Sequence, residues 1–384
     1  MSVTEPLGFQ AAGVAAGIKA NGRPDLALVV NQGPRQDAAA VFTSNRVFAA
    51  PVAWSRQAVA DGLLRAVILN SGGANACTGP GGYADSVATA QRVAQVVGCD
   101  AEQVGICSTG LIGVRLPMTQ LLTGVDQAHR ALSVDGGHDA AHAIMTTDTV
   151  PKQAFAQGVG GYTIGGMAKG AGMLAPALAT MLVVVTTDAV VDADALQSSL
   201  QQACSLTFDR IDSDGCMSTN DTVFLLASGA SGVTPEPDEF TMTLAKVCWR
   251  LARQLIADAE GAAHDIEIEV VNAASEDDAL QVARSIARSN LFKCAIFGND
   301  PNWGRVLSAI GVTDAVFEAD QLDVSINGVQ VCRAGGVGED RSLVDLTPRA
   351  CHVLVDLHAG PAAATIWTND LTYDYVKENA EYSS

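Results

Sequence analysis

A lysine, two glycines and a threonine lie close together in the middle of the chain, and together they could perform nucleophilic chemistry. Lys169 and the glycines at 170 and 172 lead through small residues and a proline to Thr180, which opens an apolar run. A hydroxyl group at this junction, directly after the compact Ala179, could attack its own peptide bond. Cleavage would make Thr180 a new N-terminus, whose α-amine titrates near ~7.7–8.0 and could act as the base for its own hydroxyl group. The residues alone leave open that Thr180 is an ordinary β-branched residue entering a strand.

A second candidate element is the turn at Thr109 and Gly110, which follows a short apolar run at 104–108. A threonine hydroxyl group and backbone N–H groups beside a glycine can stabilise a carbonyl oxygen that becomes negatively charged. A well-aimed donor of this kind contributes roughly 2.7–4 kcal/mol. A plain turn would have the same sequence, so both interpretations stay open.

Two charged residues could bind a substrate. Lys169 lies among glycines and apolar residues, where it could pair with a substrate carboxylate or polarise the Thr180 hydroxyl group. Glu260 follows the longest helical pattern, and a carboxylate at a helix C-terminus is disfavoured by the helix dipole. This placement suggests that Glu260 receives an ammonium group of an amino-acid substrate, although solvated surface charges are the alternative for both residues.

The segment 169–182 resembles the self-processing site of the ornithine acetyltransferase family, the glutamate N-acetyltransferases of the cyclic arginine pathway. Two further stretches match this family, Ser-Thr-Asn-Asp-Thr at 218–222 and Asp-Pro-Asn-Trp-Gly-Arg at 300–305, and both are expected to shape the site. The resemblance covers nearly the whole chain, from Gly13 onward. One departure is Ala263-His264, where many members of the family have Thr-Lys.

The resemblance implies autocatalytic cleavage between Ala179 and Thr180. An α fragment, 1–179, and a β fragment, 180–384, would stay together, with Thr180 as the nucleophile and Thr109 and Gly110 as the oxyanion hole. The acetyl group of N2-acetylornithine would pass to glutamate by a ping-pong mechanism through an acetyl-threonine. The implied substrate-binding residues are Thr146 (with Thr147 as its nearest rival), Lys169, Thr180, Glu260, Asn379 and Ser384.

The same resemblance implies a mixed α/β fold of the self-processing, N-terminal-nucleophile-like αββα type. It implies no metal and no organic cofactor, and an α2β2 heterotetramer of the two fragments. It leaves open whether acetyl-CoA is a second acetyl donor and whether the enzyme serves arginine synthesis or a specialised pathway.

Composition narrows the class of protein. A net charge of −19 argues against nucleic acid and against anionic membranes. A hydrophobic content of 48% with 17% charged residues indicates a globular protein. The chain has no apolar run near the ~20 residues of a membrane span and does not begin like a signal peptide, so we expect a cytoplasmic enzyme. The nine cysteines are scattered and form no C-x-x-C pair, which fits neither zinc nor a disulfide framework.

The elements that must position these residues follow from hydrophobic periodicity. Helices are expected at 83–97, 116–132, 194–204, 239–259 and 276–289, and strands at 64–69, 104–108, 181–185, 221–227 and 265–271. Two hairpins are expected near the end, with strands at 322–326 and 329–332 around Asn327-Gly328 and at 353–357 and 363–368 around 358–361. Helices and strands alternate first and antiparallel pairs come later, which predicts mixed α/β layers.

Two other classes of function were weighed. The pattern G-x-G-x-x-A at 170–175, with Asp188 further on, fits the fingerprint of an NAD-dependent oxidoreductase. However, Pro176 falls where the crossover helix should continue, and too few residues remain for a strand, a helix and a second strand. The other class is a non-catalytic metabolite-binding protein, which would remain one intact chain.

Overall fold

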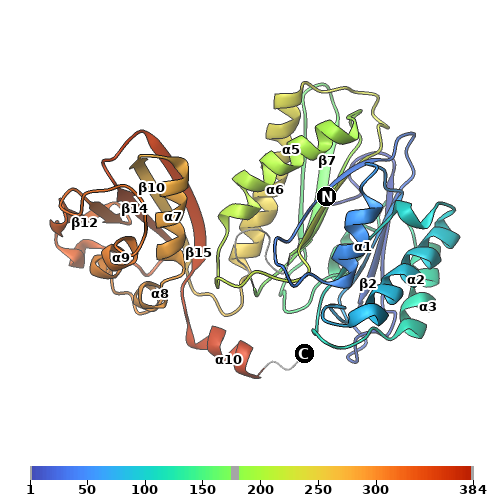
Figure 1. The fold of residues 1–384 in the computed structure, drawn as a ribbon, viewed down its shortest axis with the longest axis horizontal. Helices are drawn as coiled ribbons and strands as arrows, with labels where there is room; N and C mark the ends of the chain where they lie inside the picture. The colour runs from blue at the N-terminus through green and yellow to red at the C-terminus, as the bar shows by residue number, and fades with distance from the viewer. Residues whose placement is uncertain (1, 174–180, 382–384) are drawn as a thin grey trace.

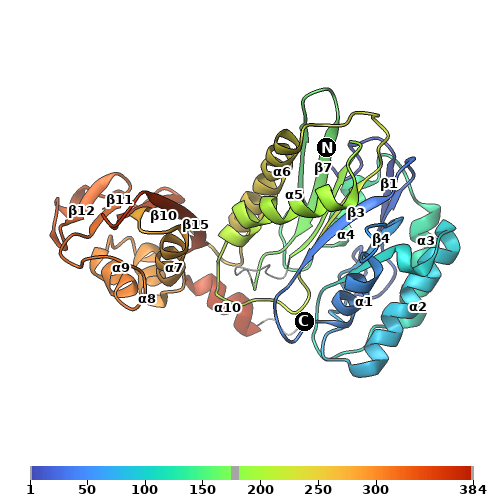
Figure 2. The same ribbon diagram turned by 45° about the horizontal axis from the view of Figure 1, so that its top comes forward.

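The computed structural model describes residues 2–173 and 181–381, which form a larger and a smaller body (Figure 1). The larger body contains two β-sheets, and the smaller body, toward the C-terminal end, contains a third. The last helix, α10 (Tyr373–Glu381), leaves the smaller body and runs back toward the larger one, as both ribbon views show (Figures 1 and 2).

The first sheet of the larger body has four strands, of which the last two, β4 and β5, run parallel. Helices from the same part of the chain pack against it. The strand order is β1 (Phe9–Val14), β2 (Leu26–Asn31), β4 (Ala66–Asn70) and β5 (Val104–Ser108), and the helices are α1 (Ala50–Ala58), α2 (Gly79–Val97), α3 (Met118–Arg130) and α4 (Gly137–Ala143).

The second sheet has five strands drawn from both sides of the predicted cleavage site. Helices α5 (Ala193–Leu206) and α6 (Pro237–Ala257) pack against it. The strand order is β3 (Asp37–Phe42), β9 (Thr222–Ala227), β8 (Leu182–Thr187), β7 (Thr163–Lys169) and β6 (Lys152–Gln157).

The two sheets pack face to face, as the alternation of side chains along β8 shows. Leu182 and Val184 belong to the core shared with the first sheet, whereas Val183 and Val185 belong to the core under α5 and α6. A Cβ atom on Gly105 of β5 would lie 2.7 Å from the ring of Phe224 in β9, so glycine permits this close approach. The larger body is therefore a four-layer αββα structure, which confirms the predicted fold class.

The smaller body is a six-stranded sheet covered by helices α7 (Glu276–Ala287), α8 (Asn290–Phe297) and α9 (Trp303–Ile310). The two bodies also touch through the rings of Trp249 and Trp367, which meet edge to face at 60° with centroids 4.2 Å apart. The strand order is β13 (Gly336–Val337), β12 (Val329–Arg333), β11 (Asp323–Ile326), β14 (Ala350–Asp356), β10 (Asp265–Ala273) and β15 (Ala362–Asn369).

One of the two predicted hairpins forms and the other does not. Asn327 and Gly328, with φ of 46° and 83°, connect β11 to β12 as expected. The prediction of a hairpin between 353–357 and 363–368 is wrong, because β10 lies between β14 and β15 and pairs with both. β14 and β15 each pair with β10 along most of their length instead of pairing with each other.

Helix ends follow their local signals. α2 ends at Gly98, whose φ of 80° is left-handed, and the Asp192 side chain accepts a hydrogen bond from the Ala195 N–H (3.0 Å) at the start of α5. The end of α2 at Val97 is as predicted, and α5 begins at Ala193, one residue before its predicted start. α3 begins at Met118, later than expected, because Pro117 occupies its cap position.

The strands around the glycine pair exclude a dinucleotide-binding unit. β7 and β8 are adjacent and antiparallel, with Lys169 opposite Leu182, whereas that unit needs two parallel strands joined by a helix. The fingerprint at 170–175 is therefore fortuitous.

Within residues 2–173 and 181–381, no helix has the length and apolar character needed to cross a membrane.

Candidate functional site

A cleft of about 450 Å³ opens where strands of both central sheets begin or end, and α10 borders one side of it. Its lining draws on segments far apart in the sequence. Six of the predicted site residues line this one cleft: Thr109, Gly110, Thr146, Lys169, Glu260 and Asn379. Thr147, the rival of Thr146, lines it as well. The other predicted residues, Ala179, Thr180 and Ser384, lie outside the described residues.

The Thr109-Gly110 turn is held against a second glycine-rich loop. The Thr109 N–H donates to the Asn70 carbonyl (3.0 Å), and the Gly73 N–H donates to the Thr109 carbonyl (2.9 Å). Gly110 has φ of 128°, and a Cβ atom there would lie 2.8 Å from the Gly73 nitrogen. Only glycine suits this position, so the turn presents its backbone to the cleft in one fixed conformation.

Asn220 connects this turn to the neighbouring loop. Its buried side-chain amide donates to the Ser108 carbonyl (2.9 Å) and to the Ala74 carbonyl (2.6 Å). The sequence indicated that 218–222 shapes the site, but it did not single out Asn220. Since both carbonyls lie on loops that border the cleft, Asn220 holds the two loops at a constant spacing.

Lys169 lies at the base of the cleft with only 2% of its surface exposed. Its Nζ is 3.9 Å from Oδ2 of Asp148, a carboxylate that Lys152 also contacts (2.7 Å). Burial lowers the pKa of Lys169, and the charges of Asp148 and Glu260 oppose that shift. For Asp148, burial raises the pKa, but the two lysines outweigh it and the pKa falls to about 2.

Glu260 lies against the glycine segment that follows Lys169. Its N–H donates to the Ala171 carbonyl (3.0 Å), and a Cβ atom on Gly172 would lie 2.5 Å from its Oε2 atom. Asn379 of α10 donates from Nδ2 to the same Oε2 atom (3.0 Å). The carboxylate is thus fixed between α10 and the segment that leads toward the predicted cleavage site.

Two aspartates that the sequence did not single out border this region. Asp214 lines the cleft and accepts a hydrogen bond from the Met173 N–H (2.6 Å), and burial raises the pKa of its carboxyl group. Asp221 is fully buried and accepts a hydrogen bond from the Met181 N–H (3.0 Å). Burial raises the pKa of Asp221 well above its ordinary value. Since Met181 follows Thr180, Asp221 lies beside the start of the predicted β fragment.

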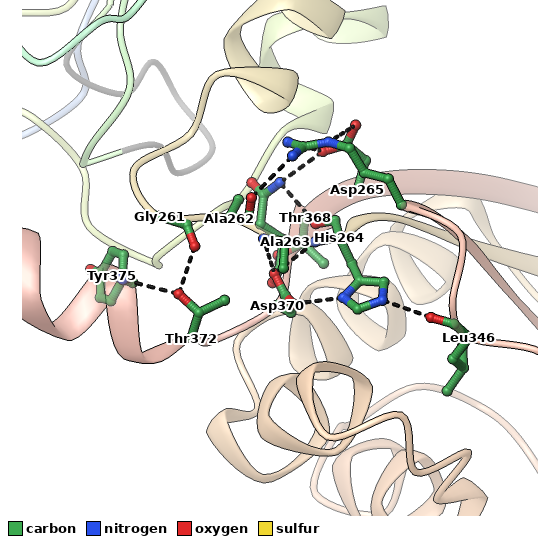
Figure 3. Close-up of polar contacts among 12 residues, drawn as sticks. Gly261, Ala262, Ala263, His264, Asp265, Leu346, Thr368, Asp370, Thr372 and Tyr375 are labelled. Atoms are coloured by element: carbon green, nitrogen blue, oxygen red, sulfur yellow. Dashed lines mark hydrogen bonds and ion pairs between the residues drawn. The ribbon is translucent and has the colours of Figure 1, made fainter.

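Ala263 and His264, the departure from the family pattern, form an anchor for the C-terminal segment (Figure 3). Asp370 accepts from the N–H groups of Ala263 (3.0 Å) and His264 (2.9 Å), and its other oxygen lies 2.7 Å from the His264 Nδ1 atom. The Nε2 atom lies 2.8 Å from the Leu346 carbonyl. Both ring nitrogens therefore lie within hydrogen-bond distance of an oxygen atom from another segment.

The anchor continues toward α10. Thr372 donates to the Gly261 carbonyl (2.6 Å) and accepts from the Tyr375 N–H (3.0 Å) (Figure 3). Gly261 has φ of 60°, and a Cβ atom there would lie 2.2 Å from the Tyr375 nitrogen. The start of α10 is thus pinned to the segment directly after Glu260, which explains how Asn379 reaches the cleft.

Among the described residues, no group of three or more histidine, cysteine, aspartate or glutamate side chains is placed to hold a metal ion. The nine cysteines, all within the described ranges, are unpaired.

The larger body has the αββα layers of the N-terminal-nucleophile-like fold, and a cleft at its strand ends holds a buried lysine, a glycine turn and fixed carboxylates. The chain belongs to the ArgJ family, whose profile matches residues 10–384, and it is an acyltransferase of arginine biosynthesis. This membership leaves the oxidoreductase and the non-catalytic alternatives without support.

Several relatives are similar over their full length. The arginine biosynthesis bifunctional proteins ArgJ of Streptomyces coelicolor and Streptomyces avermitilis are each 65% identical over 384 residues, with 100% of both chains covered. That of Thermobifida fusca is 63% identical over the same span. Among solved structures, ornithine acetyltransferase of Mycobacterium tuberculosis complexed with ornithine is 59% identical over 46% of this chain and 94% of that chain, with a TM-score of 0.45.

Proposed function

We propose that this enzyme moves the acetyl group of N2-acetylornithine to glutamate through an acetyl ester on Thr180, after its chain is cleaved between Ala179 and Thr180. One observation carries the proposal: the Thr109-Gly110 turn, the Lys169 ammonium group and the Glu260 carboxylate line a single cleft. N2-acetylornithine presents an acetyl carbonyl oxygen, a carboxylate and a side-chain ammonium group, which these three elements complement. The name of the Mycobacterium tuberculosis relative and its bound ornithine support the same class of substrate.

The cleavage step needs only the chain and water. The Thr180 oxygen attacks the carbonyl carbon of Ala179, the peptide C–N bond breaks, and the proton lost by the hydroxyl group passes to the Thr180 nitrogen. Water then hydrolyses the resulting ester, which leaves a carboxylate on Ala179 and a free α-amine on Thr180.

The transfer reaction repeats the same chemistry on the substrate. The α-amine of Thr180 takes the hydroxyl proton while the oxygen attacks the acetyl carbon, and the proton then passes to ornithine as its C–N bond breaks. The amine of glutamate attacks the ester in the second half-reaction and returns a proton to the Thr180 oxygen. Thr109 and Gly110 hold the oxyanion in both steps.

The two fragments would remain associated because they share a sheet. β6 and β7 precede the cleavage site, β8 and β9 follow it, and β7 pairs with β8 over the range Ile164 to Lys169. The proposal includes two copies of each fragment in an α2β2 heterotetramer. The relatives are named bifunctional, which makes acetyl-CoA the second donor to test.

Intact mass spectrometry and a transfer assay test this function together. The purified enzyme should give two masses, for 1–179 and 180–384, and should convert N2-acetylornithine and glutamate to ornithine and N-acetylglutamate. Thr180→Ala should remain a single chain without transfer activity. A fully active enzyme that is one uncleaved chain would overturn the mechanism, and a Thr180→Ala variant that still splits would overturn the residue assignment. Assays with acetyl-CoA in place of acetylornithine, and size-exclusion chromatography, test the second donor and the heterotetramer.

A further inference from the structure

Asp148 lies behind the cleft wall, where it contacts two of the elements that carry predicted substrate-binding residues. Its side chain is fully buried. Oδ1 accepts hydrogen bonds from the Gly170 N–H (2.7 Å) and from Lys152 Nζ (2.7 Å), and Oδ2 accepts from the Thr146 N–H (3.0 Å). Oδ2 also lies 3.9 Å from Lys169 Nζ. One carboxylate thus connects the loop of Thr146 with the end of β7.

Lys152 has a second carboxylate partner, so the role of Asp148 is not limited to pairing with Lys152. Asp258 contacts Lys152 Nζ at 2.5 Å and accepts a hydrogen bond from the Thr149 N–H (2.9 Å), so it can balance that ammonium group. Two ammonium groups therefore face two carboxylates, of which Asp148 is fully buried. In this arrangement Asp148 faces Lys169 as well as Lys152, and an opposite charge nearby favours the charged form of a buried ammonium group.

Charged groups reach Lys169 from every element packed around it. Asp148 comes from the loop after α4, Lys152 from β6, Glu260 from the segment after α6, and Asp221 from the start of β9. Lys19, which follows β1, adds a further positive charge. Among these charged groups, Asp148 has the largest effect on the pKa of Lys169, and it favours the charged form of the lysine.

We propose that Asp148 is the positioning residue of the substrate site: it holds the Lys169 ammonium group and the Thr146 backbone at the cleft wall, where the ammonium group pairs with a substrate carboxylate. Asp148 does not itself line the cleft, so it acts through these two neighbours. This inference rests on the proposed acetyl transfer from an N-acetylated amino acid.

The test compares Asp148→Asn with Asp258→Asn in the transfer assay, over a range of pH. The two variants make the same chemical change on the two carboxylates that contact Lys152, but only Asp148 also faces Lys169. Asp148→Asn should raise KM for N2-acetylornithine at least about tenfold and shift the alkaline limb of kcat/KM downward by about 1 pH unit, since it removes an opposite charge near Lys169. Asp258→Asn should leave that limb in place.

Lys152→Met keeps the inference testable if Asp148→Asn does not fold. It removes a positive charge beside Lys169, so the alkaline limb should move upward. The inference is overturned if the limb stays in place in Asp148→Asn or Lys152→Met, or moves equally in Asp258→Asn. Absence of acetyl transfer by the wild-type enzyme would instead overturn the proposed function, which keeps the two failures distinct.

Discussion

Asp370→Ala should detach the C-terminal segment from the cleft. In the wild-type protein this carboxylate accepts three hydrogen bonds, from the Ala263 N–H, the His264 N–H and the His264 ring (Figure 3). Alanine leaves all three donors without an acceptor in a buried region. The segment that follows leads directly to α10, which carries Asn379.

The size of the effect follows from the donors that lose their partner. A buried donor without an acceptor costs about 1–3 kcal/mol, and three donors lose their acceptor in this variant. Water entering the space left by the carboxylate recovers part of this cost, so the three losses do not add. We expect the free energy of unfolding to fall by about 3–5 kcal/mol.

Urea denaturation followed by tryptophan fluorescence measures this change, since Trp367 lies in β15, close to Asp370 in sequence. The KM for N2-acetylornithine should rise in parallel, because Asn379 loses its fixed position beside Glu260. Asp320→Ala makes the same substitution at an exposed site and should change stability by less than about 0.5 kcal/mol. A fall of less than about 1 kcal/mol in Asp370→Ala would refute the anchor.

Other predictions follow from the site. Gly110→Ala should lower kcat by at least about tenfold with little change in KM, because the added Cβ displaces a turn that, as the proposed oxyanion hole, stabilises only the transition state; an unchanged kcat in initial-rate assays would contradict this. Asn220→Ala should cost about 1–3 kcal/mol in urea denaturation and should also lower kcat, since two loop carbonyls lose their donor. The folded-state pKa of Asp148 is depressed, so its charge stabilises the wild-type protein relative to Asp148→Asn by about 2 kcal/mol above pH 3.8. That advantage should disappear as the pH falls from 3.8 to about 2 in acid titrations of both proteins, and an advantage that grows there would refute the assignment. His264→Lys, the residue type of many family members, should keep transfer activity because an ammonium group can still reach Asp370.

Local signals in the sequence located α2, α3, α5, α6 and α7 and many of the strands, but β1, β2, β3, β6 and β7 were not predicted. The alternation along 265–271 predicted the strand that spans Asp265–Ala273, and the Asn-Gly pair predicted its hairpin. The failure at β14 and β15 has a physical cause. Their partner, β10, precedes them in the chain by most of the smaller body, and strand pairing over such a distance depends on packing, which a single sequence does not display.

The same limit applies to the site. The predicted residues were found because they resemble a family motif or because a charge stood in an apolar segment, as Lys169 does. Asp148 and Asp370 carry no such mark, and the family-like stretch at 218–222 did not single out Asn220, although each of the three is buried and bonds to backbone groups of other segments. From the sequence alone, one polar loop residue cannot be distinguished from another. Once the fold is known, a buried polar side chain is recognisable, because its polar atoms must form hydrogen bonds inside the protein.

The position of the predicted cleavage site relative to the sheet explains how one cut could create a catalytic group without dismantling the site. Lys169 ends β7 and Leu182 begins β8, and these two residues face each other across the sheet. Met181 is held by Asp221, and Glu260 holds Ala171 on the other side of the interval. A break between residues 179 and 180 would therefore fall in a connection whose two ends are each fixed by the same sheet and cleft. The new α-amine would start one residue before Met181, whose backbone N–H Asp221 already binds.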